Sequence, residues 1–203
     1  MKLFHVHNPG YLDELYEVGN TITIGELENK LRLDLLKEAK RYASLIRFKM
    51  VNGSLLCDRN GNLITVNDIP NLSEYDQALL CYRIYGPTFD NMKDIRELVL
   101  EEIRSMYYPE KPSRYTCMWL TDEDSLIFWK NMISPNAAQI FEMDVSGKLF
   151  ASTNELLPWI MSTPEEMQKK GYNYWNPTNE DLKGSRTKEY LFEGKARVLR
   201  RIQ

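Results

Sequence analysis

Glu189 is the residue of this chain best placed to do chemistry. It begins the segment EYLFE, where Leu191 and aromatic side chains surround it, and a carboxylate in apolar surroundings needs a compensating role. Held in such a place, it could stabilise positive charge that develops in a transition state. The alternative is an exposed strand carboxylate that forms an ion pair with Lys188 or Arg197.

A second group of candidates lies where a helical pattern gives way to a strand, at Pro112-Ser113-Arg114-Tyr115. A guanidinium at this point can hold a phosphate through two parallel hydrogen bonds. A plain helix-to-strand connection would also use Pro and Ser. Further along, Tyr174 and Trp175 could stack on a planar ligand or wall a cleft, or could belong to the core.

The histidines and cysteines exclude several classes of site. His5 and His7 alternate with apolar residues in KLFHVH, so a strand places both on one face. The chain lacks GxGxxG, GxxxxGK[ST], HExxH and GxSxG motifs, which argues against Rossmann, P-loop, zincin and α/β-hydrolase proteins. Its three cysteines have no CxxC spacing, so we expect reduced, structural thiols and no metal, with Cys117 buried and inert.

Positive charge is concentrated in residues 183–201, which hold seven Lys and Arg residues but only two Glu residues. That segment is therefore +5, and because the whole chain carries −3, the rest carries −8. The asymmetry suggests an anionic ligand such as a pyrophosphate or a nucleic-acid backbone. An exposed edge hairpin protected from aggregation by Lys and Arg explains it equally well.

The elements that must position these residues follow from hydrophobic periodicity. We expect a strand over residues 2–7, an amphipathic helix over 25–46, a small hairpin region over 52–66 and a helix that begins at Ser73. The clearest helix lies over residues 90–107. Its apolar stripe is predicted to consist of Met92, Ile95, Leu98, Val99, Ile103 and Met106.

After Pro109 and Pro112 the pattern becomes β-rich, with the short segments YTCMWL, QIFEMDV, KLFAS, EYLFE and ARVLRRI. Two helices are expected among them, one that begins at Thr121 and one that begins at Thr163-Pro164 and is closed by Gly171. This order predicts an α+β fold with a mostly antiparallel sheet.

The bulk properties are those of an ordinary globular protein. A chain of 203 residues with 43% hydrophobic content can bury one sizeable core, so we expect a single domain over residues 1–203. The first ten residues lack the apolar core of a secretion signal, and no stretch approaches the roughly 18 apolar residues of a membrane span. We therefore expect a soluble, cytoplasmic protein.

Four separated pieces together resemble the ADP-ribosyltransferase superfamily: LFHVH, the run EEIRSMYYPEKPSRYTCMWLTDED, YNYW and TKEYLFEGKARVLRRI. The similarity is to the diphtheria-toxin and poly(ADP-ribose) polymerase branch, and most of all to a group of small prokaryotic members long catalogued without a function. It implies split antiparallel β-sheets that form an NAD cleft, with residues 8–110 as a helical elaboration between the first strand and the core sheet. NAD would be a co-substrate.

The resemblance also implies roles for individual residues. It makes Glu189 the catalytic carboxylate, which would stabilise the oxocarbenium-like state as the nicotinamide bond breaks. It makes His5, Ser113, Arg114, Tyr115, Tyr174 and Trp175 the candidates for NAD binding. Two features depart from the wider superfamily: the first strand lacks the arginine of the cholera-toxin-like branch, and Thr187 stands where arginine-modifying members have Glu or Gln. Arginine side chains of a target protein are thus a less favoured acceptor of the ADP-ribose.

Three functions from different classes follow. The first is an NAD-dependent mono-ADP-ribosyltransferase, an intracellular toxin or defence effector that modifies a nucleic acid or a protein and is held by an antitoxin. The second is an NAD glycohydrolase, in which water accepts the ADP-ribose. The third is a non-catalytic module that binds a nucleotide or RNA. An interaction protein built on the helices over 25–46 and 90–107 ranks behind these, because their charged faces are expected to be solvated.

Overall fold

The computed structural model describes residues 2–10, 12–25, 93, 95–158, 162 and 164–202. Apart from Gly25, the helix predicted over 25–46 lies outside these residues, as do the 52–66 hairpin and the helix from Ser73. The chain divides into two compact units, Met1–Arg32 with Arg96–Gln203 and Leu33–Ile95, and the description below is of the first. A single domain over the whole chain stays a prediction.

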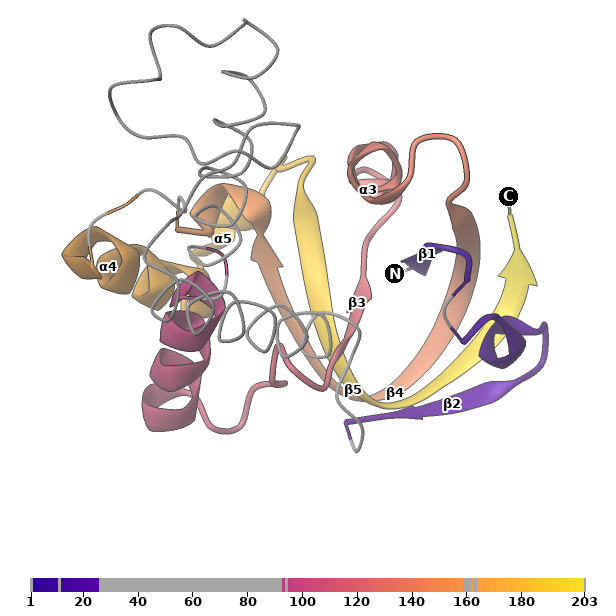
Figure 1. Cartoon of the computed structure of the whole chain (residues 1–203), viewed down its shortest axis with the longest axis horizontal. Helices are drawn as coiled ribbons and strands as arrows, with labels where there is room; N and C mark the ends of the chain where they lie inside the picture. Colours follow the sequence, from indigo (N-terminus) through magenta and orange to yellow (C-terminus); the bar gives the residue numbers. More distant parts are fainter. Residues whose placement is uncertain are drawn as a thin grey trace, which may run out of the picture. The chain divides into compact units, whose positions relative to one another are not determined.

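The described strands form one five-stranded, antiparallel sheet, so the α+β prediction is confirmed at this level (Figure 1). The order is β1-β4-β5-β2, and β3 pairs with β5. Strand β2, in the stretch expected to be a helical elaboration, was not predicted. The strands are β1 (Leu3–His7), β2 (Thr21–Ile24), β3 (Met118–Leu120), β4 (Gln139–Thr153) and β5 (Lys188–Arg201).

Strands β4 and β5 form one long, bent antiparallel pair, where the sequence predicted four short segments. The two predicted breaks fall at Gly147 and Gly194, which face each other across the ladder. A Cβ on Gly147 would lie 2.2 Å from the carbonyl oxygen of Glu193, and a Cβ on Gly194 would lie 2.5 Å from that of Ser146. The two glycines therefore let the backbones approach closely at a bend without interrupting the pairing.

The sheet is curled, because β1 contacts both β4 and the end of β3, which are distant from each other in the sheet. β1 pairs with the beginning of β4, and Phe4 also pairs with Thr121 at the end of β3, which in turn pairs with the beginning of β5. Figure 1 shows β1 and β3 inside the arc of the β4–β5 pair. One core cluster fills this concave side; its buried members are Leu3, Ile22, Met118, Leu120, Phe141, Met143, Tyr190, Phe192, Ala196 and Val198.

A second core cluster lies on the opposite face, under the helix of residues 95–107 (the 95–107 helix) and α4 (Pro164–Trp175). The prediction that α4 ends at Gly171 is wrong. The helix continues because Gly171 is a packing position, where a Cβ would lie 2.6 Å from Cδ1 of Ile103. The buried members of this cluster are Leu100, Ile103, Cys117, Phe150, Tyr174, Trp175 and Leu191.

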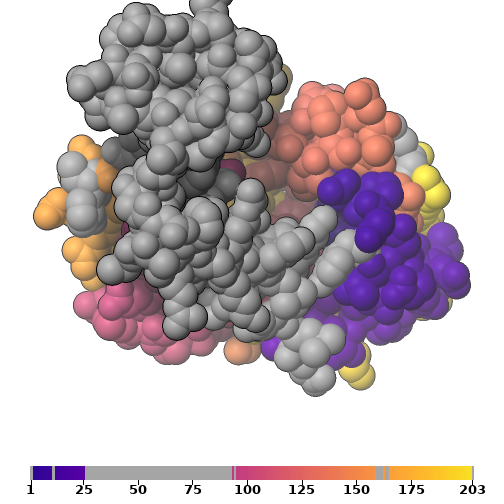
Figure 2. Space-filling view, viewed as in Figure 1, coloured from indigo at the N-terminus to yellow at the C-terminus, as the bar shows by residue number. Residues whose placement is uncertain are grey.

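The helix predicted from Thr121 begins later, at α3 (Leu126–Ile133). Thr121 is occupied in the pairing with Phe4, and the Asp122 carboxylate accepts a hydrogen bond from the Ser125 N–H at 3.0 Å just before the helix. Helix α3 lies on the surface (Figure 2). The remaining short helices are η1 (Asp13–Tyr16), η3 (Asn154–Leu156) and α5 (Asn179–Leu182). None of the described helices is long and apolar enough to cross a bilayer.

Candidate functional site

Glu189 lies at the beginning of β5 and faces the helical layer. Side chains alternate along the strand, so Glu189 and Leu191 point toward the 95–107 helix and α4, while Tyr190 and Phe192 point into the other core. Glu189 is 3% exposed. The alternative of an exposed strand charge is thus wrong, and Lys188 forms its ion pair with Asp122 instead, at 2.7 Å.

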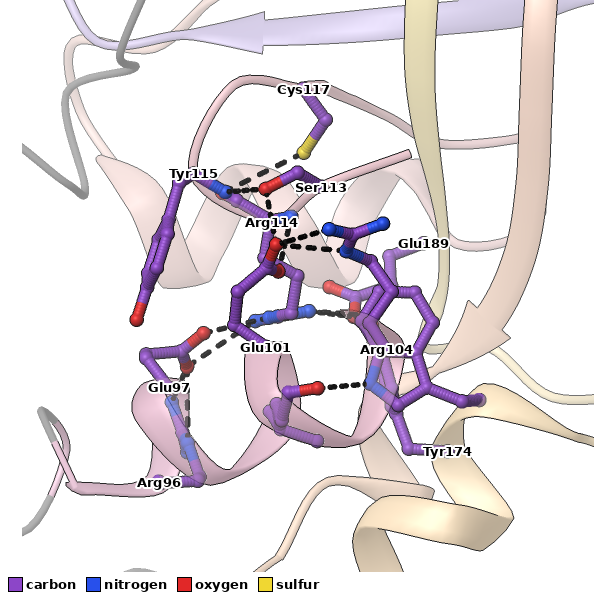
Figure 3. A network of polar contacts seen from close by, with 12 residues as sticks. Arg96, Glu97, Glu101, Arg104, Ser113, Arg114, Tyr115, Cys117, Tyr174 and Glu189 are labelled. Carbon is purple, nitrogen blue, oxygen red and sulfur yellow. Dashed lines mark hydrogen bonds and ion pairs between the residues drawn. The ribbon is translucent and has the colours of Figure 1, made fainter. Parts of the chain in front are cut away.

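Arg114 and Tyr174 meet at the Glu189 carboxylate (Figure 3). Nη1 of Arg114 lies 3.0 Å from Oε1 of Glu189, and the Tyr174 hydroxyl donates a short hydrogen bond to the same oxygen. The same Arg114 nitrogen donates to the Tyr174 hydroxyl. Residues 60 and 75 positions away from Arg114 in the chain are therefore joined in one buried contact.

A second carboxylate, Glu97, holds the other side of the Arg114 guanidinium. Nε of Arg114 lies 2.7 Å from Oε2 of Glu97, and Arg96 donates to Oε1 of Glu97 at 2.9 Å. Glu97 is 1% exposed, whereas Leu98 on the predicted apolar stripe is 56% exposed. Glu97 was not predicted as a site residue, because the predicted apolar stripe is only in part the buried face of this helix: Ile103 is buried, but Leu98 is exposed. The (i, i+4) spacing of Glu97 and Glu101 was the available indication of a polar buried side.

The charges in this cluster support one another. Burial alone would lower the pKa of Arg114, but Glu97, Tyr174 and Glu189 raise it well above its ordinary value. Burial alone would raise the pKa of Glu97, but Arg114 and Arg96 lower it. The pKa of Tyr174 is raised well above its ordinary value, mainly by burial and with a contribution from Glu189. The tyrosine is consequently a protonated donor over the whole physiological pH range.

Ser113 belongs to the same network but not to the Glu189 contact. Its hydroxyl donates to Oε1 of Glu101 at 2.7 Å, and its N–H donates to Oε1 of Glu193 at 2.9 Å. Arg104 also donates to Glu101, at 2.8 Å. These carboxylates fix the turn before β3 and so set the direction of Arg114.

Two aromatic candidates are placed as follows. Trp175 is fully buried, donates from its indole N–H to the Leu100 carbonyl at 2.7 Å and stacks on Phe150 at 5.1 Å. A ring so enclosed is already stacked within the core. Tyr115 is half-buried, and its N–H donates to the Ser113 hydroxyl at 3.2 Å.

The structure does not bring His5 to Glu189. His5 and His7 share one face of β1, as predicted, and both rings contact Tyr16. That face also carries Leu3, which belongs to the concave core, whereas Glu189 points to the helical side. A hydrogen bond of 2.9 Å joins Nδ1 of His5 to the Trp119 carbonyl, and burial lowers the pKa of His5 to about 4.

Cys117 is buried, and burial raises the pKa of its thiol well above the ordinary value, which agrees with the inert thiol predicted for it. Cys57 and Cys81 lie outside the described residues. Within the described part of the chain, no three His, Cys, Asp or Glu side chains come together as a metal site would require.

Three of the seven basic residues in 183–201 face a carboxylate. Nε of Arg200 lies 2.6 Å from Glu142, and Arg197 stands opposite Asp144 in the ladder. With the Lys188–Asp122 pair, this is the pattern of a charged but locally neutralised strand pair. Because β5 pairs with β4 on one side and with β2 and β3 along most of the other, it is an interior strand, so the prediction of an exposed edge hairpin is wrong. The paired charges also weaken the case for an anion-binding surface on this part of β5.

The part described here thus defines a class: α+β proteins with one curled antiparallel sheet and a buried Arg-Glu-Tyr cluster at the beginning of β5. The chain belongs to the family described as "Protein of unknown function (DUF2441)", whose model matches residues 3–203. No curated protein matches the sequence.

Proposed function

We propose that this protein is a cytoplasmic, NAD-dependent mono-ADP-ribosyltransferase with Glu189 as its catalytic residue. One observation carries the proposal. Arg114, Tyr174 and Glu189 come from three separate motifs that suggested this chemistry in the sequence, and their side chains meet at a single carboxylate oxygen. The finer fold, with split sheets around an NAD cleft, is part of the same proposal.

The arrangement at Glu189 suits the reaction. Both hydrogen bonds from Arg114 and Tyr174 end on Oε1, so Oε2 is the oxygen that can accept a bond from a ribose hydroxyl. As the bond to nicotinamide breaks, the ribose gains positive charge, and a carboxylate held in a low-dielectric site stabilises it. Arg114 and Tyr174 hold that carboxylate in place. His5 faces the other core and has no role at Glu189.

The acceptor is a nucleic acid or a protein, and the biological role proposed is that of an intracellular toxin or defence effector restrained by an antitoxin. The matched charges on β5 weaken the charge argument for a nucleic acid, which leaves both acceptor classes in the proposal. Transfer to water on the same site would make the protein an NAD glycohydrolase, and the test below separates the two.

A specific observation favours a second candidate, a non-catalytic module that binds a nucleotide or RNA. Glu189 and Glu97 are almost fully buried on either side of Arg114, and such a triad can be purely structural. In that case Glu189 would organise the core while a ligand bound elsewhere.

The test is nicotinamide release from labelled NAD by the purified protein, by Glu189→Gln and by the control Glu155→Gln. Glutamine keeps the shape of the side chain and removes its charge. Glu155 is an exposed carboxylate, 34 residues before Glu189 in the sequence. We expect release by the wild type and the control, and a loss of at least about 100-fold in Glu189→Gln.

The fate of the label completes the test. Label in a protein or nucleic-acid fraction of a cell extract identifies a transferase and its acceptor class, while free ADP-ribose identifies a glycohydrolase. Absence of both NAD binding and nicotinamide release in folded wild-type protein would overturn the enzyme and leave the binding module.

A further inference from the structure

A groove lies on the outer side of the helical layer, between the 95–107 helix and α4. In Figure 1 these two helices lie side by side at the left, in magenta and orange. The groove has a volume of about 420 Å³, within the range of small-ligand sites. Its lining is formed by Val99, Glu102, Ile103, Met106, Tyr107, Glu165, Gln168 and Tyr172.

The lining combines aromatic rings with carboxylates. The rings of Tyr107 and Tyr172 meet edge to face at 5.2 Å. Glu102 and Glu165 contribute one carboxylate from each helix, and neither forms an ion pair with a described residue. Tyrosine faces and unpaired carboxylates both attract a cation, and they repel phosphate.

The apolar surface extends beyond the groove along the 95–107 helix. Met106 and Tyr107 of the lining are 61% and 57% exposed, and Leu98, on the same ridge as Met106 with Glu102 between them, is 56% exposed. Leu98 and Met106 are eight residues apart, which corresponds to about 12 Å along a helix axis. A surface of this length exceeds what one small cation would cover, and it matches about two turns of a packed helix.

We propose that this groove binds a basic, amphipathic segment of a partner protein, which places an Arg or Lys between Glu102 and Glu165. The stem of that side chain lies on Tyr107 and Tyr172, and apolar residues of the same segment cover Met106 and Leu98. Charge complementarity and the length of the exposed apolar stripe identify the occupant. The proposal is independent of the enzymatic activity proposed for Glu189.

The test uses protein labelled with ¹³C at the methionine methyl groups, with the Met106 resonance assigned from Met106→Leu. The probe is a synthetic amphipathic peptide with Leu and Arg at helical spacing, and its counterpart carries Glu in place of Arg. We expect the basic peptide to shift the Met106 resonance and the acidic peptide to leave it in place. Replacing both carboxylates, in Glu102→Gln/Glu165→Gln, should weaken binding by at least about tenfold.

A matched control removes two exposed carboxylates outside the groove, in Glu110→Gln/Glu155→Gln, and should bind as tightly as the wild type. Three results would each overturn the proposal. These are a Met106 resonance that the basic peptide does not move, equal binding by the double groove variant, and equal binding of spermidine, which would make the groove a site for small cations.

Discussion

At the scale of single residues, the buried cluster at Glu189 depends on Arg114 as a shared donor. Its guanidinium donates from Nη1 to Glu189 and from Nε to Glu97, so one cation serves two buried carboxylates, of which Glu97 is also paired with Arg96. The pKa of Glu97 is lowered as a result. The positive charge beside Glu189 therefore comes from Arg114, a residue 75 positions earlier in the chain.

His5 makes the stability of the fold depend on pH. Its pKa falls from 6.5 to about 4 on folding, so the unfolded chain binds a proton between these values that the folded protein does not. Stability is thus complete above pH 6.5 and is lost as pH falls toward 4, by about 3 kcal/mol. We expect His5→Phe, measured by urea unfolding from pH 7 to 4, to flatten this dependence.

A control on the same strand separates titration from packing. Phe4 is buried and points away from His5, so Phe4→Leu should lower stability equally at all pH values. A His5→Phe protein with the same pH slope as the wild type would show that another group is responsible.

At the scale of elements, the contact between the 95–107 helix and α4 depends on Gly171. Alanine there would place a Cβ 2.6 Å from the end of the Ile103 side chain, which outweighs the better helix propensity of alanine. We expect Gly171→Ala to lower the free energy of unfolding by about 1 kcal/mol in urea titrations. Combining it with Ile103→Val removes the obstructing Cδ1 and should restore the lost stability.

The exposed Lys169 on the same helix provides the comparison, because Lys169→Ala changes no packing and should be neutral. If Gly171→Ala stabilised the protein in the presence of Ile103, the close approach of the two helices would be disproved.

Element types were predictable here, but boundaries and faces depended on tertiary contacts. Alternation predicted β1 and apolar periodicity predicted the 95–107 helix, because both patterns are local. Gly171 and Gly147 look like breakers in the sequence, yet each marks a close approach to a distant segment. Part of the buried face of the 95–107 helix was missed because Glu97 is buried only through its partner Arg114, which no local pattern shows.

At the scale of the whole described unit, Arg114 connects three elements: the 95–107 helix through Glu97, α4 through Tyr174 and β5 through Glu189. Arg114→Met would leave Glu189 buried without a cation and Glu97 with Arg96 as its remaining cation. We expect a loss of about 3–5 kcal/mol at pH 7, measured by urea unfolding.

Arg186 is exposed, so Arg186→Met is the matched control and should cost little. A loss as small as that of the control would mean that Arg114 does not hold these elements together. The meeting of Arg114, Tyr174 and Glu189 could be anticipated only by combining distant motifs. The absence of His5 from this contact could not be anticipated, because it depends on which face of the curled sheet each strand presents.

The spacing of the partners of Arg114 has a consequence during protein synthesis. Glu97 precedes Arg114 by 17 residues and is already present when the ribosome adds the arginine, whereas Glu189 follows 75 residues later on the final strand of the sheet. Until β5 is made and pairs with β4, the nascent chain contains Glu97 and Tyr174 as partners of Arg114 but not Glu189. If Glu189 is catalytic, the chain is harmless to its own cell throughout translation of the first 188 residues.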